Sequence, residues 1–463
     1  MSQTTRPTSA ANPSQAASPG QAAGLDQAAV PDQSATVGQA VSVPTVAGRL
    51  DEARASIRRS LSGSPGRLRI LALAAVAVSL IFAVGAFSAF GAADGALGRG
   101  GANTAQLVRI QSIHTNLVRA DADATNAFLV GGLEPADQRA GYTSAMTQAS
   151  RFIADAANAQ PADGRALGAL NSLVLTYGGL VEQARATNRQ ALPVGAQYLR
   201  VASSGLRSDA LPILDALVKA NTDRVGAELD AAGRASTMLI LSGVLALAAL
   251  ISGMIWLSRR THRYVNPPLA AATAGILVTL VVGVIALGAV GSRVDDIRKG
   301  SYAATLATAK ARIAAFDAKS NESLTLIARG SGSSFEKAWV GSSKVVTDES
   351  GKAARLNGEA KLGPLWAEYA KIHTRIRAAD NGGQWERAVA QATGKGANTA
   401  NAAFDSFDVQ SAKALDSSKN SASTSLDAPR TWLPFAAWFG LLLGLAAAVS
   451  AWWGVSLRLE EYR

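Results

Sequence analysis

The chain of 463 residues contains no cysteine and only three histidines. Without cysteine, neither a disulfide framework nor thiol chemistry is available. The histidines, His114, His262 and His373, lie on separate segments, and the sequence contains no HExxH, GxSxG or cysteine-cluster pattern. We therefore expect no enzymatic activity, no metal site and no cofactor.

Ionisable residues are absent from four stretches of roughly twenty residues or more, the length that a helix needs to cross the ~30 Å hydrocarbon core of a bilayer. The stretches are Ile70–Ala93, Thr237–Leu257, Leu269–Val290 and Trp432–Val455. Buried helices of soluble proteins rarely contain apolar runs of this length. The sequence therefore predicts an integral membrane protein with four transmembrane helices in a lipid bilayer.

Arginines are concentrated beside the ends of these stretches. Arg259, Arg260 and Arg263 lie between the second and third spans, and five more arginines lie within residues 54–69. Because short cytoplasmic loops carry an excess of Lys and Arg, we expect both termini in the cytoplasm. The three loop arginines are also candidates for contact with a cytoplasmic partner. No run combines basic residues with stacking aromatic residues on one soluble face, so nucleic-acid binding is not expected.

These signals predict an all-α chain with two tandem extracytoplasmic four-helix bundles. Residues 1–45 are rich in Ala, Gln, Ser, Pro and Thr, which predicts a disordered cytoplasmic tail. The remaining predicted segments are a basic juxtamembrane segment (46–69), the first span (70–93), the first bundle (94–236), the second span (237–257), a cytoplasmic loop (258–268), the third span (269–290), the second bundle (291–431), the fourth span (432–455) and a cytoplasmic tail (456–463).

Both extracytoplasmic segments have apolar residues at helical spacing. In the first segment, helices are expected over Gly101–Val130, Glu134–Asn158 and Pro161–Asn188, and from Pro193 towards the second span. In the second segment, breaks are expected at Gly330–Ser334, Gly351–Gly363 and Asn381–Gly383. Pro212 should kink or divide the fourth helix of the first segment. The first and last helices of each bundle should continue into the membrane.

The order of span, outer segment and span occurs twice, which indicates an internal duplication. With an offset of 196 residues, Leu117 aligns with Ile313, and Asp121 aligns with Asp317. The apolar seam then has the same phase in both copies. We interpret the two outer segments as copies of one unit.

The two aligned carboxylates border the apolar seam, about 40 Å from the membrane at 1.5 Å of rise per residue. The candidate ligand-binding residues are Asp121 and Asn126 in the first copy and Asp317, Asn321 and Glu322 in the second. They are suited to the amino group of a small ligand. The alternative is a structural hydrogen bond or an ion pair with a neighbouring helix, for instance with an arginine.

His373 forms a stripe at three- and four-residue spacing with Trp366 and Tyr369. Such a stripe is typical of core packing, and a metal-binding or acid–base role is the less favoured alternative.

The architecture resembles the four-helix sensor domains of bacterial chemoreceptors, here in duplicate. The span order, the low-complexity N-terminal tail and the phrases RADADATNAFLVGGLEP (Arg119 to Pro135) and FDAKSNESLTLIARGSG (Phe316 to Gly332) further resemble the actinobacterial GlnX membrane proteins. This resemblance implies a protein of the bacterial plasma membrane. It also implies two partners, an extracytoplasmic amino-acid-binding lipoprotein of the GlnH type and the cytoplasmic Ser/Thr kinase PknG.

The expected function is therefore non-enzymatic transmembrane signalling in response to glutamate, aspartate or glutamine. Two alternatives stay open, a direct small-molecule sensor and a structural protein of envelope assembly. Formation of a homodimer also stays open. A docked lipoprotein would contact the distal turns of the bundles, at Val130–Gln138, Asn188–Gly195, Ala328–Glu336 and Asp380–Trp385. In these turns, Arg329 and Trp385 are of the types enriched at binding hot spots.

Overall fold

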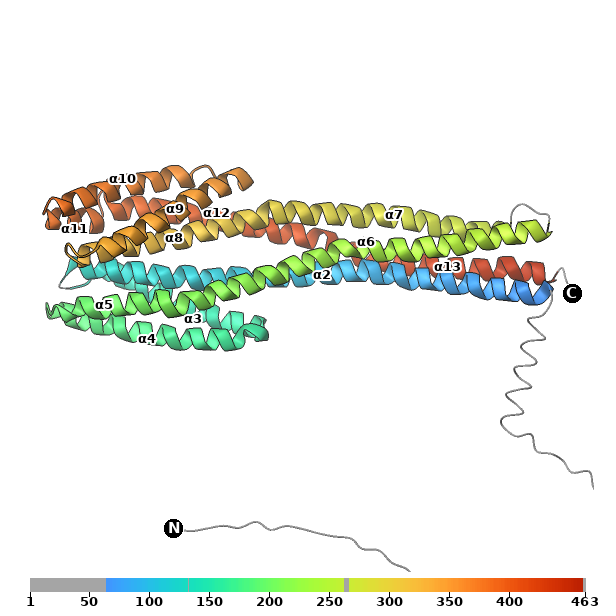
Figure 1. Ribbon diagram of the computed structural model, residues 1–463, viewed down its shortest axis with the longest axis horizontal. Coiled ribbons are helices and arrows are strands. Elements are labelled where there is room, and N and C mark those ends of the chain that lie inside the picture. Colours follow the sequence, from blue (N-terminus) through green and yellow to red (C-terminus); the bar gives the residue numbers. More distant parts are fainter. Residues whose placement is uncertain (1–63, 132, 262–265, 461–463) are drawn as a thin grey trace, which may run out of the picture. The chain divides into compact units, whose positions relative to one another are not determined.

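Every regular element among the described residues is a helix (Figure 1). The computed structural model describes residues 64–131, 133–261 and 266–460, which belong to one folded unit. The elements are α2 (Ser64–Val130), α3 (Ala136–Ala159), the short 3₁₀ helix η1 (Pro161–Asp163), α4 (Gly164–Arg189), α5 (Val194–Gly205), the π-helix η2 (Leu206–Ala210), α6 (Leu211–Thr261), α7 (Pro267–Lys299), α8 (Ser301–Ile327), α9 (Ser333–Asn357), α10 (Leu362–Asn381), α11 (Trp385–Thr393), α12 (Ala400–Arg430) and α13 (Leu433–Glu460). The predicted all-α class is confirmed for these residues.

Four helical stretches are long and apolar enough to cross a membrane. They are Gly66–Val130, Val194–Arg259, Pro267–Ile327 and Ala400–Leu457. Large apolar side chains in their hydrophobic windows remain uncovered by the rest of the chain, such as Leu241 and Ile285, each 67% exposed. Exposed apolar surface of this extent is typical of membrane contact. The four stretches therefore fit a multi-pass membrane protein.

The four apolar windows pack on one another through small residues. α2 contacts α6 and α13, and α7 contacts the same two helices. On α13, a Cβ atom added at Gly444 would lie 2.6 Å from the Cα atom of Ala83, and one at Gly440 would lie 3.0 Å from the Cβ atom of Ala86. Glycines at four-residue spacing allow two membrane helices to approach closely. The contact between α2 and α13 therefore depends on these two glycines.

The first bundle consists of the end of α2 with α3, α4, α5 and the start of α6. Its buried core includes Ile113 and Leu117 of α2, Ile153 of α3, Val174 of α4 and Leu199 of α5. The α2 residues of this core recur at three and four positions, so they form one face of the helix. α2 is 67 residues long and extends about 100 Å at 1.5 Å per residue. One helix thus contains an apolar membrane window and a wall of the first bundle.

The second bundle consists of α8 to α12 and packs against the same helix α2. Val118, Ala122 and Leu129, on another face of α2, join a core that includes Phe316 and Trp366. α8 is buried on nearly all sides, although it contains Lys319, Asn321 and Glu322. The buried polar side chains of α8 require partners, and they form the centre of the candidate site.

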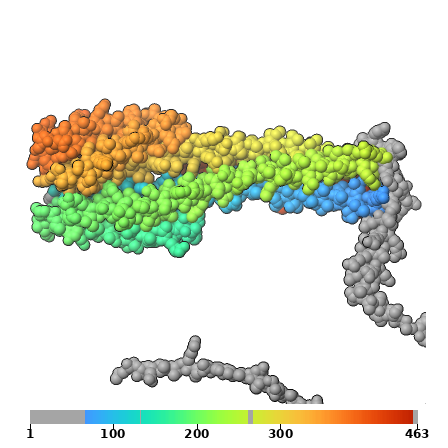
Figure 2. Space-filling model, in the orientation of Figure 1, coloured from blue at the N-terminus to red at the C-terminus, as the bar shows by residue number. Residues whose placement is uncertain are grey.

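Figure 2 shows α6 and α7 packed against each other, in agreement with the contacts between these helices.

The helix boundaries agree with most of the sequence expectations. α2 ends before Gly131, whose φ of +68° suits a glycine, and α3 and α4 begin close to the predicted positions. The predicted fourth helix is divided near Pro212, because α5 ends at Gly205, the π-helix η2 follows, and Pro212 lies in the first turn of α6. The predicted break at Gly351–Gly363 is narrower, since α9 continues to Asn357 and α10 begins at Leu362. The separate short helix α11 was not predicted.

Asn266, the residue directly before α7, contacts α13. Pro267 and Pro268 occupy the first positions of α7, where a proline needs no backbone hydrogen-bond donor. The side chain of Asn266 donates a 2.6 Å hydrogen bond to the carbonyl oxygen of Gly454 in α13. Arg259 is exposed near the end of α6, whereas the side chains of Arg260 and Arg263 lie outside the described residues.

Candidate functional site

The two bundles meet at the guanidinium group of Arg207, which lies in the π-helix η2. Its Nη1 atom is 2.9 Å from Oδ2 of Asp121 in α2, and its Nε atom is 2.9 Å from Oδ1 of Asp317 in α8. Its Nη2 atom donates to the hydroxyl of Ser320. One side chain from the first bundle therefore bridges the two carboxylates that the sequence alignment paired.

Asp121 is almost completely buried and has partners on both oxygens. Oδ1 accepts hydrogen bonds from Ser203 at 2.5 Å and from Tyr177 at 3.3 Å. Oδ2 accepts one from Ser320 at 2.6 Å in addition to the Arg207 contact. This geometry favours the structural alternative for Asp121, an ion pair with an arginine of a neighbouring helix.

Arg207 remains charged in this setting. Burial lowers its pKa, but the charges of Asp121 and Asp317 outweigh burial and raise the pKa above its ordinary value. Asp317 is more open than Asp121 and also accepts hydrogen bonds from Ser342 at 2.6 Å and from Asn321 at 3.1 Å. The bridge therefore connects η2, α2, α8 and α9 through one cation.

Glu322 lies in a second polar network within the second bundle. It is fully buried, 2.9 Å from Nζ of Lys319 and 2.9 Å from Nδ1 of His373. Burial raises the pKa of Glu322, but Lys319 and His373 outweigh burial and hold this pKa at about 2. His373 is therefore not a purely apolar core residue. It stacks on Trp339 and also contacts Glu336 at 3.3 Å.

Among the remaining candidates, Asn126 accepts a hydrogen bond from Gln138 and faces Asn401 of α12 at 3.4 Å. Arg329 and Trp385 lie together, with the guanidinium carbon 4.0 Å from the centre of the indole ring. Both line a cavity of about 560 Å³ with residues of the turns that follow α2 and α4. Distal turns of both bundles therefore gather around one cavity.

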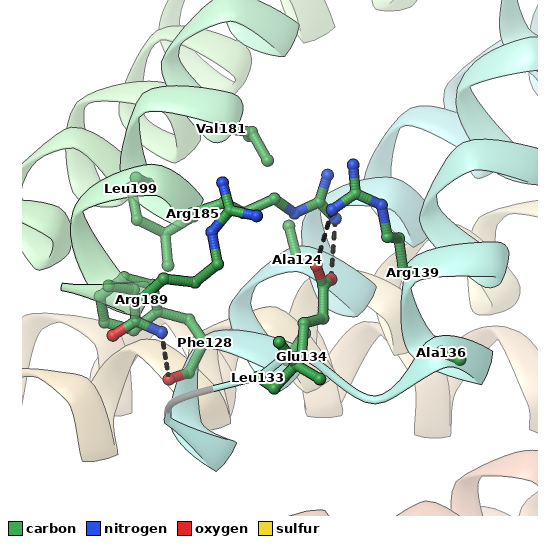
Figure 3. Close-up of a pocket in the computed structure, with 13 residues that line it drawn as sticks. Ala124, Phe128, Leu133, Glu134, Ala136, Arg139, Val181, Arg185, Arg189 and Leu199 are labelled. Atoms are coloured by element: carbon green, nitrogen blue, oxygen red, sulfur yellow. Dashed lines mark hydrogen bonds and ion pairs between the residues drawn. The ribbon is translucent and has the colours of Figure 1, made fainter. Parts of the chain in front are cut away.

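A smaller cavity of about 240 Å³ lies between α2, α3, α4 and α5 of the first bundle. Figure 3 shows Arg139 of α3 and Arg185 of α4 converging on Glu134, which lies in the turn before α3. Nη2 of Arg185 is 2.9 Å from Oε1 of Glu134, and Nη1 of Arg139 is 3.8 Å from Oε2. Arg189 also lines the cavity and forms no ion pair with another residue in the described ranges.

The lining of this cavity combines positive charge with apolar surface. It includes three arginines but only one carboxylate, and Phe128, Val181 and Leu199 supply apolar walls. Guanidinium groups bind carboxylates at two points, and apolar walls accept the carbon skeleton of a ligand. The cavity is chemically suited to a small organic anion.

A family of known proteins matches this part of the chain. Residues 96–230 match the actinobacterial sensor domain. The matched segment contains the whole lining of the cavity in Figure 3, together with Asp121 and Arg207. No curated protein and no solved structure matched the chain. The family match supports a sensor-type actinobacterial protein with a role in sensing or signalling.

Sequence reasoning identified the two bridged carboxylates but missed Arg207. The only signal was its position between Gly205 and Pro212, where the expected kink fell. The arginines of the Figure 3 cavity were also missed, because Arg139 and Arg185 belong to different helices and only the packing of these helices brings them to Glu134.

Proposed function

We propose that this protein is a non-enzymatic transmembrane transducer of the bacterial plasma membrane. In this proposal, an extracytoplasmic solute-binding lipoprotein loaded with glutamate, aspartate or glutamine docks on the two bundles. The signal passes through the bilayer to a cytoplasmic Ser/Thr kinase of the PknG type. The sensor-domain match supports the sensing role, and the resemblance to the GlnX proteins suggests the ligand class and both partners.

The observation that carries this proposal is the continuity between the membrane windows and the bridge at Arg207. α2 extends without interruption from its apolar window to Asp121, and α6 begins four residues after Arg207 and ends near Arg259. A displacement at the bridge is therefore applied directly to two membrane helices. Small shifts or rotations of packed helices are an established way to transmit such a displacement.

The proposed docking surface is the set of distal turns around Arg329 and Trp385. Leu133 and Leu192, in the turns after α2 and α4, are exposed by 87% and 45%. Leu192 lines the same cavity as Arg329 and Trp385, and an exposed apolar side chain beside an arginine stacked on a tryptophan has the composition of a binding hot spot. Because the cavity there is lined by turns of both bundles, one bound protein would contact both.

The proposed topology places both termini and the loop containing Arg259, Arg260 and Arg263 in the cytoplasm. This loop connects α6 to α7, so it joins the last helix of one proposed copy to the first helix of the other. The basic side chains of the loop would then contact the kinase. The pairing of Asp121 with Asp317 on one cation supports the proposed origin of the bundles by duplication.

The binding test uses the full-length protein in lipid nanodiscs and the purified lipoprotein, with and without bound amino acid. We expect the loaded lipoprotein to bind, and Arg329→Ala combined with Trp385→Phe to weaken binding at least tenfold, or about 1.4 kcal/mol. Replacement of the exposed Lys371 by Ala is the control, because its ion pair with Glu368 is also exposed. Binding that is unchanged by the double replacement would exclude the distal turns as the docking surface.

A second candidate function, direct sensing of a small molecule, is favoured by the cavity in Figure 3. Its lining falls entirely within the matched sensor segment. Calorimetry of the full chain with glutamate, aspartate and glutamine, without lipoprotein, distinguishes the two candidates. Direct sensing predicts binding that Arg185→Met weakens, whereas the transducer proposal predicts no heat until the lipoprotein is added.

A further inference from the structure

A second charged cavity, of about 350 Å³, lies between the two bundles. It is lined by Arg119, Asp123 and Asn126 of α2, by Gln138 of α3, by Lys319 of α8, and by Asp405 near the start of α12. Its volume corresponds to about a dozen water molecules at ~30 Å³ each, which suits a small metabolite. A ligand in this cavity would touch both bundles at once.

Most cations around this cavity already have close anionic partners. Nζ of Lys319 is 2.9 Å from Glu322, and Nζ of Lys395 is 2.6 Å from Asp137. The remaining lining cation is Arg119, whose Nε atom is 3.9 Å from Oδ2 of Asp123. The cavity therefore contains little positive charge to spare for its own carboxylates.

The cation closest to Asp123 in an ion pair is Arg119, at 3.9 Å, beyond hydrogen-bond distance. Burial, opposed in part by Arg119 and reinforced by Asp408 and Asp405, raises the pKa of Asp123 to about 7. Within the described part of the chain, Oδ2 of Asp123 and Oε1 of Gln138 are buried without a hydrogen-bond donor. Asp405, an exposed residue of the lining, forms no ion pair with a described residue. Buried acceptors without donors are uncommon and call for an explanation.

The geometry of α3 leaves room for this carboxylate. A Cβ atom added at Gly141, which also lines the cavity, would lie 2.7 Å from Oδ2 of Asp123. The glycine thus permits the acidic group to occupy the cavity wall. Among the described residues, no three or more His, Asp or Glu side chains are grouped so as to hold a metal ion. An organic cation is therefore the better match.

We propose that this cavity binds a small molecule with a protonated primary amine, whose ammonium group is held by Asp123, Gln138 and Asp405. An ammonium group supplies one positive charge and three N–H donors, which these acceptors lack. Bound in this way, the ligand connects α2 and α3 of the first bundle to α12 of the second. The site belongs to the chain itself and does not depend on the proposed lipoprotein.

Binding is tested by calorimetry on the full chain in nanodiscs. The probes are 1,4-diaminobutane and 1-aminobutane, which carry protonated amines, and 1,4-butanediol, the neutral counterpart of the diamine. We expect at least one amine to bind and the diol not to bind. Asp123→Asn should weaken amine binding at least tenfold, whereas Asp155→Asn, an exposed position on α3, should leave it unchanged. No amine binding up to about 10 mM, or binding that Asp123→Asn leaves unchanged, overturns the proposal.

A second measurement does not require the identity of the ligand. Gln138→Lys places an ammonium group beside Asp123, and we expect it to raise the Tm of the full chain by about 2–4 °C. Gln148→Lys, at an exposed position on the same helix, is the control and should not change the Tm. A Tm that Gln138→Lys lowers or leaves unchanged contradicts a cavity built for a primary amine.

Discussion

Asp121 and Asp317, which are 196 positions apart in the sequence, share the guanidinium group of Arg207, with one 2.9 Å contact to each. Asp121 is only 1% exposed. A buried ion pair of this kind contributes little net stability, but removal of one partner leaves an uncompensated charge. The bridge therefore fixes how the two bundles pack, and it responds strongly to the loss of one charge.

Asp121→Asn should destabilise the protein by about 3 kcal/mol, because Arg207 would lose its most buried anionic partner. Asp317→Asn should cost less, since Asp317 is about a quarter exposed. Urea unfolding of the full chain in detergent, followed by tryptophan fluorescence, measures both effects. Asp348→Asn is the matched control, because the ion pair of Asp348 with Lys344 is exposed and should contribute less than about 1 kcal/mol. Equal losses for Asp121→Asn and Asp348→Asn would contradict a bridge that organises the interface.

The network around Glu322 should make stability depend on pH at both ends of the range. Because its folded pKa of about 2 is below the ordinary value of 4.5, Glu322 stabilises the fold above about pH 4.5, and this contribution disappears as the pH falls towards 2. The shift corresponds to about 3 kcal/mol. Burial lowers the pKa of His373, but Glu322 and Glu336 outweigh burial and raise it above 6.5. Its contribution is therefore complete below pH 6.5 and is lost as the pH rises through the raised value.

Unfolding free energies of the native chain and of Glu322→Gln, measured from pH 3 to pH 9, test this dependence. The difference between the two proteins should narrow below about pH 4.5, because the unfolded chain then binds a proton at Glu322 while the folded chain still holds it ionised. Glu368→Gln replaces an exposed carboxylate and should give a constant difference near zero. A difference for Glu322→Gln that does not vary with pH would exclude a charged Glu322 in the folded state.

Arg329 has a φ of +41°, in the left-handed region that costs a residue other than glycine about 1 kcal/mol. Its stacking on Trp385 stabilises the folded state by about 0.5–1 kcal/mol. Arg329→Gly should therefore leave the free energy of unfolding nearly unchanged, because relief of strain offsets the lost contact. Arg329→Ala keeps the strain and should cost about 1 kcal/mol. Denaturant titration distinguishes the two variants, and equal costs would argue against the strained conformation.

Gly444 allows α13 to approach the backbone of α2 at Ala83. Gly444→Leu should separate these helices and destabilise the protein by about 2 kcal/mol, within the range of overpacked cores. Gly288→Leu is the control, since a Cβ atom added at Gly288 meets no other atom within 4 Å. Thermal unfolding in nanodiscs measures the comparison, and similar Tm values for the two variants would contradict close packing at Gly444.

Much of the fold could be predicted from the sequence because its signals are local. Uncharged stretches, helical periodicity and glycine or proline punctuation depend only on neighbouring residues, and they gave the helix boundaries around Gly131 and Pro193. The π-helix before Pro212 was not predicted, because a proline indicates that a regular helix is disturbed but not which form the disturbance takes. α11 was missed because a helix of nine residues carries too weak a periodic signal.

The candidate site was predicted less completely, since it depends on contacts between helices. The sequence left Asp121 as either a ligand-binding carboxylate or the partner of an arginine on a neighbouring helix, and its oxygens contact Arg207, Ser203, Tyr177 and Ser320. Asp123, two residues later on α2, faces the cavity between the bundles instead. A difference of two residues turns a side chain to another face of a helix, and only the position of α8 and α12 reveals which face is open.

If an event at the bundles reaches the ends of α6 and α13 beyond the membrane, the distance between these two helix ends should change. Because the chain has no native cysteine, spin labels can be attached at Arg259→Cys in α6 and Leu457→Cys in α13, both exposed positions. Pulsed electron resonance in nanodiscs then gives the distance between the labels with and without the loaded lipoprotein. We expect binding of the loaded lipoprotein to change this distance and Arg207→Gln to abolish the change. A distance that stays the same while the lipoprotein is bound would contradict this expectation.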